Sequence, residues 1–336
     1  MFPARISQGG SLCRIRGFQM QEWTSWRKSM DKTVEFFSKM ADLGFENLSA
    51  DIQFDGTTPL IYKYVPPERV ITCLPQVGNG VLRATQPAAL NDPFECAVRS
   101  VFVEQSEEEG NLSFSEVLTC LSPVTPVSEF EVAEARQMYG SLFLRELLAR
   151  QLSERFGVVS FRARPDQLLM WSHYASNCSG FVIGYDVMQL AKLTRREGGL
   201  RPVRYGESLP LIAGYEVLEE SNINGLLSYK SSHWEYEQEW RMIVNLNDTI
   251  GIGKSDEQGQ PVNVVGVPNE AVCRVYYTER TRPDVVAEIV ERLSDPRNGY
   301  GTNEPVKMIQ STEKFEYEAE TIEPTTVRLG KSKESE

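Results

Sequence analysis

Carboxylate side chains gather in the stretch HWEYEQEWRMIV, which spans residues 233–244. Glu235, Glu237 and Glu239 occupy every second position, and Arg241 continues the series. A strand would place all four on one face and most of the aromatic residues on the other. Like charges this close repel, so one carboxylate of such a set can keep its proton and act as an acid or base. A solvated strand face held by cross-strand ion pairs is the alternative.

Polar and aromatic residues also alternate in LIYKYV, residues 60–65. Lys63 stands between Tyr62 and Tyr64. If the stretch is a strand, the two tyrosines share a face, and Lys63 either contacts a ligand or is solvated.

The stretch NDPFE, residues 91–95, has the composition of a turn. Asn91 or Asp92 can cap the next element, which is the commonest use of such residues. The functional alternative is that Asp92 or Glu95 points into a pocket.

One of the two histidines, His173, lies in MWSHYASNCSGFVIGYD, with Trp171 and Tyr174 beside it at helical spacing. A single histidine is either a hydrogen-bonded structural group or a catalyst. The polar run SNCSG that follows has none of the glycine patterns that bind phosphates.

Helices and short strands alternate along the rest of the chain. We predict strands at residues 60–65, 158–163 and 180–186, in addition to 233–244, and the clearest helix over 130–157 with Gly157 at its end. This order indicates an α+β fold with a single mixed, mainly antiparallel twisted sheet flanked by helices.

The domain organisation follows from the same patterns. We expect a disordered N-terminus over 1–19, an amphipathic helix and linker over 20–50, the main α+β domain over 51–310, and a charged tail over 311–336. Met20, where the helical pattern begins, is an alternative start to Met1.

The composition restricts the class of partner and the compartment. A formal net charge of −12 and a pI near 5.0 make nucleic acid an unfavourable partner and leave a small molecule or a protein. Six dispersed cysteines and two histidines predict no metal site and a cytoplasmic location. No apolar run reaches the roughly 18 residues that span a membrane.

Together, LIYKY, NDPFE, WSHYA with GFVIGYD, and WEYEQEWR resemble an uncharacterised prokaryotic family, domain of unknown function 2971. The resemblance covers about residues 60 to 280 and depends on the combination of motifs rather than on any one of them. It implies a fold and no activity.

The layout is also similar to that of ADP-ribosyltransferase folds, which split the nicotinamide–ribose bond of NAD. This resemblance implies that Lys63 or Tyr64 holds NAD, Tyr174 or Trp171 stacks on nicotinamide, Glu239 is catalytic and Glu237 assists it. In those enzymes the first strand carries His or Arg where this chain has Lys63.

The candidate site has further members: Asn91, Asp92 and Arg241 as NAD-binding residues, and His173 as a third catalytic residue. The main functional hypothesis is an NAD-consuming transferase or glycohydrolase without a metal, by analogy a toxin or anti-phage effector. It predicts that Lys63, Glu239 and an aromatic residue line one cleft.

Two other functions stay open at this point. A non-catalytic module for a small ligand or a protein predicts a pocket with His173 and Arg241 and with every carboxylate ion-paired. A metal-free hydrolase predicts a hydrogen bond between His173 and an acid such as Asp92.

Overall fold

The computed structural model describes residues 53–55, 58–101, 140–194, 199–213 and 220–320, all within one compact unit, Ser49–Glu336. The predicted N-terminal segment 1–19 and the predicted helix and linker over 20–50 lie outside these described residues.

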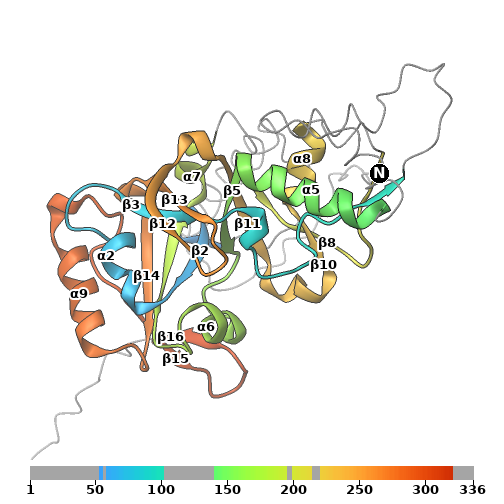
Figure 1. Cartoon of the computed structure of the whole chain (residues 1–336). Helices are drawn as coiled ribbons and strands as arrows, with labels where there is room; N and C mark the ends of the chain where they lie inside the picture. The colour runs from blue at the N-terminus through green and yellow to red at the C-terminus, as the bar shows by residue number, and fades with distance from the viewer. Residues whose placement is uncertain (1–52, 56–57, 102–139, 195–198, 214–219, 321–336) are drawn as a thin grey trace, which may run out of the picture. The chain divides into compact units, whose positions relative to one another are not determined.

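One large sheet dominates the described part of the chain (Figure 1). Its strand order is β16-β15-β14-β6-β2-β5-β11-β7, and β1 pairs with β2. Within this sheet β14 and β15 are parallel, and the other pairs are antiparallel. The strands are β1 (Gln53–Asp55), β2 (Thr58–Val65), β5 (Phe156–Arg162), β6 (Phe181–Asp186), β7 (Leu200–Pro202), β11 (Glu239–Asn245), β14 (Val272–Thr278), β15 (Val306–Gln310) and β16 (Tyr317–Ala319).

Smaller sheets accompany the large one. β8 pairs with β10 and β4 with β9, both in parallel, and β12-β13-β3 form an antiparallel sheet. These strands are β3 (Gly80–Ala84), β4 (Arg99–Val101), β8 (Arg204–Gly206), β9 (Leu211–Ala213), β10 (Tyr229–Ser231), β12 (Ile250–Ser255) and β13 (Pro261–Val267).

Helices flank the sheets, and α2 and α9 lie together beside β14 (Figure 1). The α-helices are α2 (Val70–Cys73), α5 (Gly140–Arg155), α6 (Leu168–Tyr174), α7 (Val187–Leu193), α8 (Glu220–Leu227) and α9 (Pro283–Ser294). Short 3₁₀ helices are η1 (Pro67–Arg69), η2 (Pro87–Ala89), η4 (Ser232–Glu237), η5 (Leu246–Asp248), η6 (Asn269–Ala271) and η7 (Pro296–Asn298). The α+β class, with a mixed, mainly antiparallel sheet, is confirmed.

The large sheet is almost interrupted between β2 and β5. On one side β2 pairs with β6 over six residue positions, and on the other β5 pairs with β11 over seven. Between β2 and β5 the register contains a single pair, Tyr62 opposite Arg162. Beyond this pair, β2 and β5 are not joined by strand pairing.

Aromatic residues form much of the core beside this gap. Trp171 of α6 is fully buried, donates its indole N–H to the Pro165 carbonyl at 2.7 Å, and packs edge-on against Tyr64 with ring centroids 5.6 Å apart. Trp240 of β11 is also fully buried and, by strand alternation, lies on the opposite face from Glu239 and Arg241.

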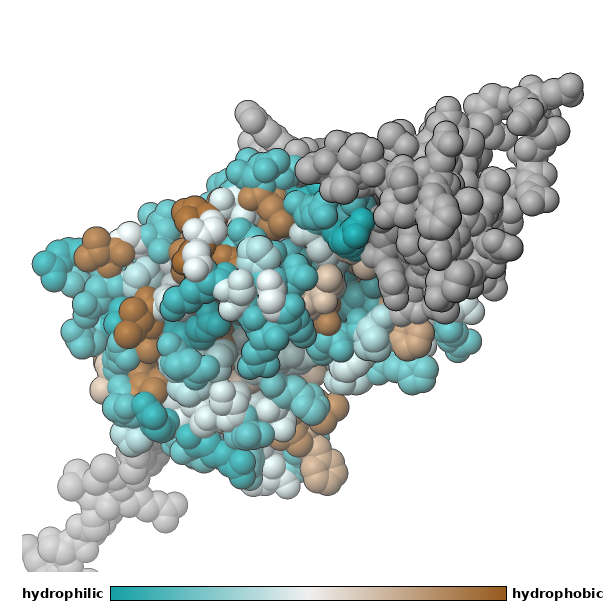
Figure 2. Space-filling view, in the orientation of Figure 1, coloured by the Kyte–Doolittle hydropathy of each residue, from teal (hydrophilic) through white to brown (hydrophobic). Residues whose placement is uncertain are grey.

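The face in Figure 2 is mostly hydrophilic, and hydrophobic residues lie on it singly or in small groups, as is normal for a protein surface.

The strand predicted over 233–244 is correct only from Glu239 onward. The Ser231 hydroxyl accepts the N–H of His233, which starts a 3₁₀ turn, and Gln238 ends it with a left-handed backbone at φ 44°. A serine cap and a left-handed end are typical signals of a helical turn. Glu235 is consequently exposed rather than on one face with Glu237 and Glu239.

Two other predicted boundaries differ from the structure. The described part of the predicted 130–157 helix ends at Arg155, and Gly157 lies within β5, where a Cβ would come 2.7 Å from that of Ala84. Gly157 therefore permits close packing rather than capping the helix. At the other end, β16 lies beyond the predicted domain end at residue 310, and residues 321–336 are outside the described part.

Gly180, directly before β6, offers a test of how α6 and β6 are joined. A Cβ at this position would lie 2.1 Å from the Val65 carbonyl oxygen, whereas a Cβ at Gly266 of β13 would meet nothing within 4 Å. We expect Gly180→Ala to lower the free energy of unfolding by about 1–3 kcal/mol, because backbone must move to make room. Gly266→Ala should leave it within about 1 kcal/mol of wild type. Urea unfolding of both variants checks this, and equal effects would contradict the packing described.

Candidate functional site

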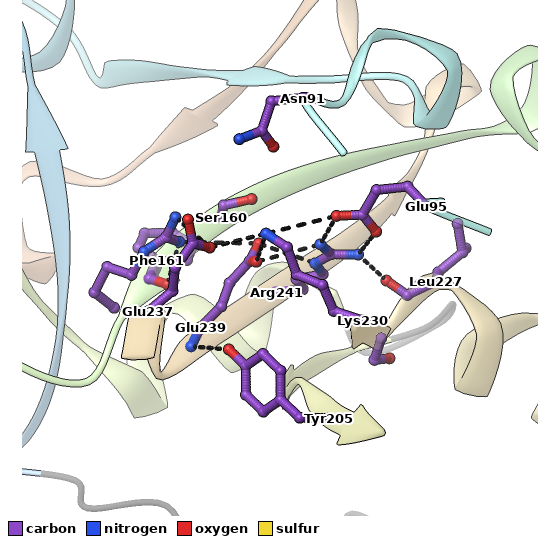
Figure 3. Close-up of polar contacts among 12 residues, drawn as sticks. Asn91, Glu95, Ser160, Phe161, Tyr205, Leu227, Lys230, Glu237, Glu239 and Arg241 are labelled. Atoms are coloured by element: carbon purple, nitrogen blue, oxygen red, sulfur yellow. Dashed lines mark hydrogen bonds and ion pairs between the residues drawn. The ribbon is translucent and has the colours of Figure 1, made fainter. Parts of the chain in front are cut away.

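A cluster of acidic and basic side chains is buried on the face of β5 and β11 that opens toward the β2–β5 gap (Figure 3). None of its members is more than 7 % exposed. We call this group the ion-pair cluster, and it consists of Glu95, Arg162, Lys230, Glu237, Glu239 and Arg241.

Arg241 lies at the centre of the ion-pair cluster. Its guanidinium donates to both carboxylate oxygens of Glu95, at 2.6 and 2.9 Å, and its Nε donates to Glu239 at 2.9 Å. It also donates to the Leu227 carbonyl at 2.7 Å. Such a bidentate pair is one of the strongest polar contacts in proteins, and it joins β11 to the NDPFE turn.

Lys230 and Arg162 complete the network. The Lys230 ammonium lies 2.8 Å from Glu237 and 3.1 Å from Glu239, and Arg162 donates to Glu237 at 2.9 Å. The formal charges of the three carboxylates and the three cations cancel. This balance is the condition for burying so many charges, because an unpaired buried ion costs several kcal/mol.

Glu239 is held ionised by its neighbours. Burial alone would raise the pKa of its carboxyl, but the charges of Arg241, Arg162 and Lys230 outweigh burial and hold the pKa well below its usual range. At neutral pH the site therefore contains a fixed negative charge out of contact with bulk water.

Strand register places these side chains together. In the antiparallel pair β5–β11, Glu239 lies opposite Arg162 and Arg241 lies opposite Ser160, so all four share a face. The backbone N–H of Glu239 donates to the hydroxyl of Tyr205 at 2.8 Å, which fixes the first residue of β11 against β8.

Tyr174 of α6 extends the cluster toward the NDPFE turn. Its hydroxyl donates to Glu237 at 2.6 Å and accepts from the Asn91 amide at 3.2 Å. The Arg162 guanidinium lies 4.8 Å from the centroid of its ring. Burial, with the charge of Glu237, raises the pKa of Tyr174, so its hydroxyl remains a proton donor.

A cavity of about 220 Å³ opens beside the cluster, and we call it the cluster cavity. It lies between β2 and β5, and residues beside η2, among them Ala89 and Leu90, also line it. The residues predicted for the site that line it are Lys63, Tyr64, Asn91, Tyr174, Glu239 and Arg241.

Lys63 differs from the other cations that line the cluster cavity, because no ion pair to a carboxylate is found for it among the described residues. Its ammonium donates to the Ser160 carbonyl at 2.8 Å and lies 5.9 Å from the centroid of the Phe161 ring. Burial and the charge of Arg162 lower the pKa of Lys63 to about 8. Lys63 thus occupies the strand gap as an amine close to losing its proton at physiological pH.

Other predicted residues lie elsewhere. Trp171 is part of the core and does not reach the cluster cavity, so it has no position from which to stack on a ligand there. His173 is exposed, its ring lies edge-on to that of Tyr174 with centroids 6.3 Å apart, and no hydrogen bond joins it to Asp92. Asp92 lines a different, larger cavity. The hydrolase hypothesis required a hydrogen bond between His173 and an acid such as Asp92, and no carboxylate of the described residues makes one with His173.

The sequence signals for the rest of the cluster were present but weak. Glu95 belongs to the quoted NDPFE turn, and Lys230 follows Tyr229 just before the acidic stretch. Arg162 is the one charged residue of β5, which is otherwise largely buried. A charged residue inside a buried strand is the signal that could have identified it, because such a residue needs a partner.

No group of histidine, cysteine, aspartate and glutamate side chains that could hold a metal ion is found in the described ranges. Within the same residues, no helix is long and apolar enough to cross a membrane.

Fold and site together define an α+β protein with a buried ion-pair cluster beside a small cavity. The family model described as protein of unknown function (DUF2971) matches residues 170–242, which confirms the resemblance to that family over this stretch. The matched stretch includes Tyr174 and the Lys230, Glu237, Glu239 and Arg241 members of the ion-pair cluster. No curated protein matches the chain, and no solved structure does.

Two neighbouring glutamates provide a matched test of the ion-pair cluster. Glu237 is fully buried with two cationic partners, whereas Glu235 is exposed. Glu237→Gln should lower the free energy of unfolding by about 3–5 kcal/mol, because it leaves buried cations without compensation. Glu235→Gln, with the same change of charge, should alter it by less than about 0.5 kcal/mol. Urea denaturation at pH 7 measures both, and similar losses would show that the cluster is not a buried network.

The environment of Lys63 predicts unusual reactivity toward amine reagents. Labelling of Lys63 by acetic anhydride, followed by peptide mass spectrometry, should reach half its maximum near pH 8, whereas exposed lysines should titrate near their usual 10.5. Between pH 8 and pH 10.5, Lys63 keeps its proton in the unfolded chain and has lost it in the folded chain. The contribution of Lys63 to the free energy of unfolding therefore becomes more favourable as the pH rises through this range. Half-maximal labelling above pH 10 would show that the ammonium is solvated.

Proposed function

We propose that the cluster cavity is the active site of an enzyme that splits the nicotinamide–ribose bond of NAD, as an ADP-ribosyltransferase or a glycohydrolase. The observation that carries the proposal is that Lys63, Tyr174 and Glu239 line one cavity. That arrangement is what the transferase hypothesis requires of a basic residue, an aromatic residue and a carboxylate.

The chemistry assigned to Glu239 suits this reaction. Departure of nicotinamide builds positive charge on the ribose, and a fixed carboxylate in a water-poor site stabilises that charge. Glu239 is ionised, 2 % exposed, and held in position by Arg241 and Lys230. Arg241 and Lys230 also reduce the negative potential at the cavity. The other polar groups that face the cavity must therefore orient the substrate.

The size of the cluster cavity limits what it can hold. Sites that bury a whole drug-sized ligand have volumes of about 300–1,000 Å³. At about 220 Å³ the cavity has room for the nicotinamide and ribose end of NAD and not for the whole dinucleotide. Lys63 and Asn91 lie at its wall and supply N–H donors for that end of the molecule.

A non-catalytic module that binds a small ligand is the second candidate. It is favoured by the pairing of the ion-pair cluster, where each carboxylate contacts at least one buried cation. A carboxylate with cationic partners at both oxygens is less available to a substrate. The two candidates share the cavity and differ in whether the bound molecule is cleaved.

The compartment proposed for either function is the cytoplasm. The cysteines Cys73, Cys96, Cys178 and Cys273 are free thiols, as expected of a protein kept in a reducing environment. An NAD-splitting enzyme there would deplete or modify cellular components, which is consistent with a toxin or an anti-phage effector.

Nicotinamide release tests the proposal. Purified protein incubated with NAD should release nicotinamide, and Glu239→Gln should reduce the rate by roughly 100- to 1,000-fold, as for loss of a group that stabilises transition-state charge. Glu235→Gln is the matched control and should keep wild-type activity, because this side chain is exposed and outside the cavity.

Calorimetry with NAD separates the two candidates. Binding without release of nicotinamide by the wild type would favour the binding module. If the wild type neither binds NAD nor releases nicotinamide, the NAD proposal for this cavity is refuted. Thermal melting of Glu239→Gln must accompany the assay, because loss of a cluster member also lowers stability.

A further inference from the structure

A second cavity of about 1070 Å³, the large cavity, adjoins the cluster cavity. Leu90 and Glu95 line both cavities. The other walls of the large cavity come from α5, from the segment after β3, and from β13. Its volume is slightly above the usual range of about 300–1,000 Å³ for small-molecule sites.

Two nearly buried side chains in this wall have unused hydrogen-bond acceptors. Asp92 is 4 % exposed, and its Oδ1 accepts the N–H of Phe94 at 2.8 Å, but its Oδ2 has no partner. Gln86 is 2 % exposed, and its amide nitrogen donates to the Pro261 carbonyl at 2.8 Å, but its Oε1 has no partner. Buried polar atoms without partners are uncommon and costly, so each one needs an explanation.

Both unused atoms accept hydrogen bonds, which determines what a ligand must supply. Among the side chains that line the large cavity, no buried nitrogen of the described residues lacks a partner. The charge of Glu95 is already balanced by Arg241 and Lys230. Among the other lining residues that the structure describes, Asp92 and Glu154 carry negative charge and Arg150 is the one cation. A ligand with several N–H donors and a positive charge fits these acceptors.

Apolar side chains complete the wall. Pro87, Leu90 and Leu246 line the large cavity together with the acceptors. They would cover a short alkyl chain while its charged end meets Asp92 and Gln86. This combination matches an alkyl ammonium or alkyl guanidinium compound.

We propose that the large cavity is a binding site for a small molecule that carries a nitrogen cation on a short alkyl chain, with Asp92 and Gln86 as the acceptors. This site is independent of the reaction proposed for the cluster cavity. Its ligand would lie against Glu95, which connects it to the ion-pair cluster through Arg241.

Agmatine, which has a guanidinium and an ammonium group on a four-carbon chain, is the probe. Calorimetry with the full chain should detect binding of agmatine, and Asp92→Asn should weaken it by at least about 10-fold, because a charge-assisted hydrogen bond is lost. Asp248→Asn, an exposed residue outside both cavities, is the matched control for the change of charge and should bind as wild type does. Butylurea, a neutral compound with N–H donors, should bind at least about 10-fold more weakly than agmatine.

A second variant protects the test against misfolding. Asp92→Ser keeps an oxygen that can accept the Phe94 N–H but removes the unused one, so it should fold and should lose agmatine binding. A capped tripeptide that contains arginine presents the same guanidinium cation in the form in which a protein would carry it. If this peptide binds more weakly than agmatine, the ligand is a free small molecule. Absence of agmatine binding by the wild type, equal binding of butylurea, or undiminished binding by both folded Asp92 variants would overturn the proposal. The readout contains no NAD, so it does not depend on the reaction proposed above.

Discussion

Charge balance within the ion-pair cluster is the constraint on which the rest of this structure depends. Glu95, Glu237 and Glu239 are withdrawn from water only because Arg162, Lys230 and Arg241 are withdrawn with them. These residues come from the NDPFE turn, β5, β10, η4 and β11, so the network forms only when segments far apart in the sequence assemble correctly. A buried network of this kind stabilises little by itself, but any incomplete version of it is strongly unfavourable. It therefore favours one arrangement of these segments over others.

Much of the fold could be predicted because local patterns report local structure. The alternation in LIYKYV and the apolar run FVIGYD identify β2 and β6, and the amphipathic pattern of PDVVAEIVERLSD identifies α9. The mixed, mainly antiparallel sheet follows from short strands interleaved with helices. Tyr174, Glu239 and Arg241 could also be placed at a site, because carboxylates and aromatics were denser there than a core requires.

The rest could not be predicted because it depends on pairing in space. Strand alternation put Glu235 beside Glu237, but the cap at Ser231 and the left-handed Gln238 turn that segment into a 3₁₀ helix and expose Glu235. Trp171 has the residue type of a stacking group, yet its burial is decided by Tyr64 and Pro165. Arg162 gives no local signal of the partner it will meet, because Glu237 is 75 residues away.

The single residue pair between β2 and β5 has a consequence for how this protein can diversify. In a continuous ladder, backbone hydrogen bonds fix the spacing of neighbouring strands. Here a single residue pair joins the two strands, and the Lys63 side chain bridges the gap by donating to the Ser160 carbonyl. An exchange of such a side chain resizes the cavity without breaking a strand pair. A point substitution at Lys63 can therefore change the size of the cluster cavity while the strand pairing on both sides of the gap stays as it is.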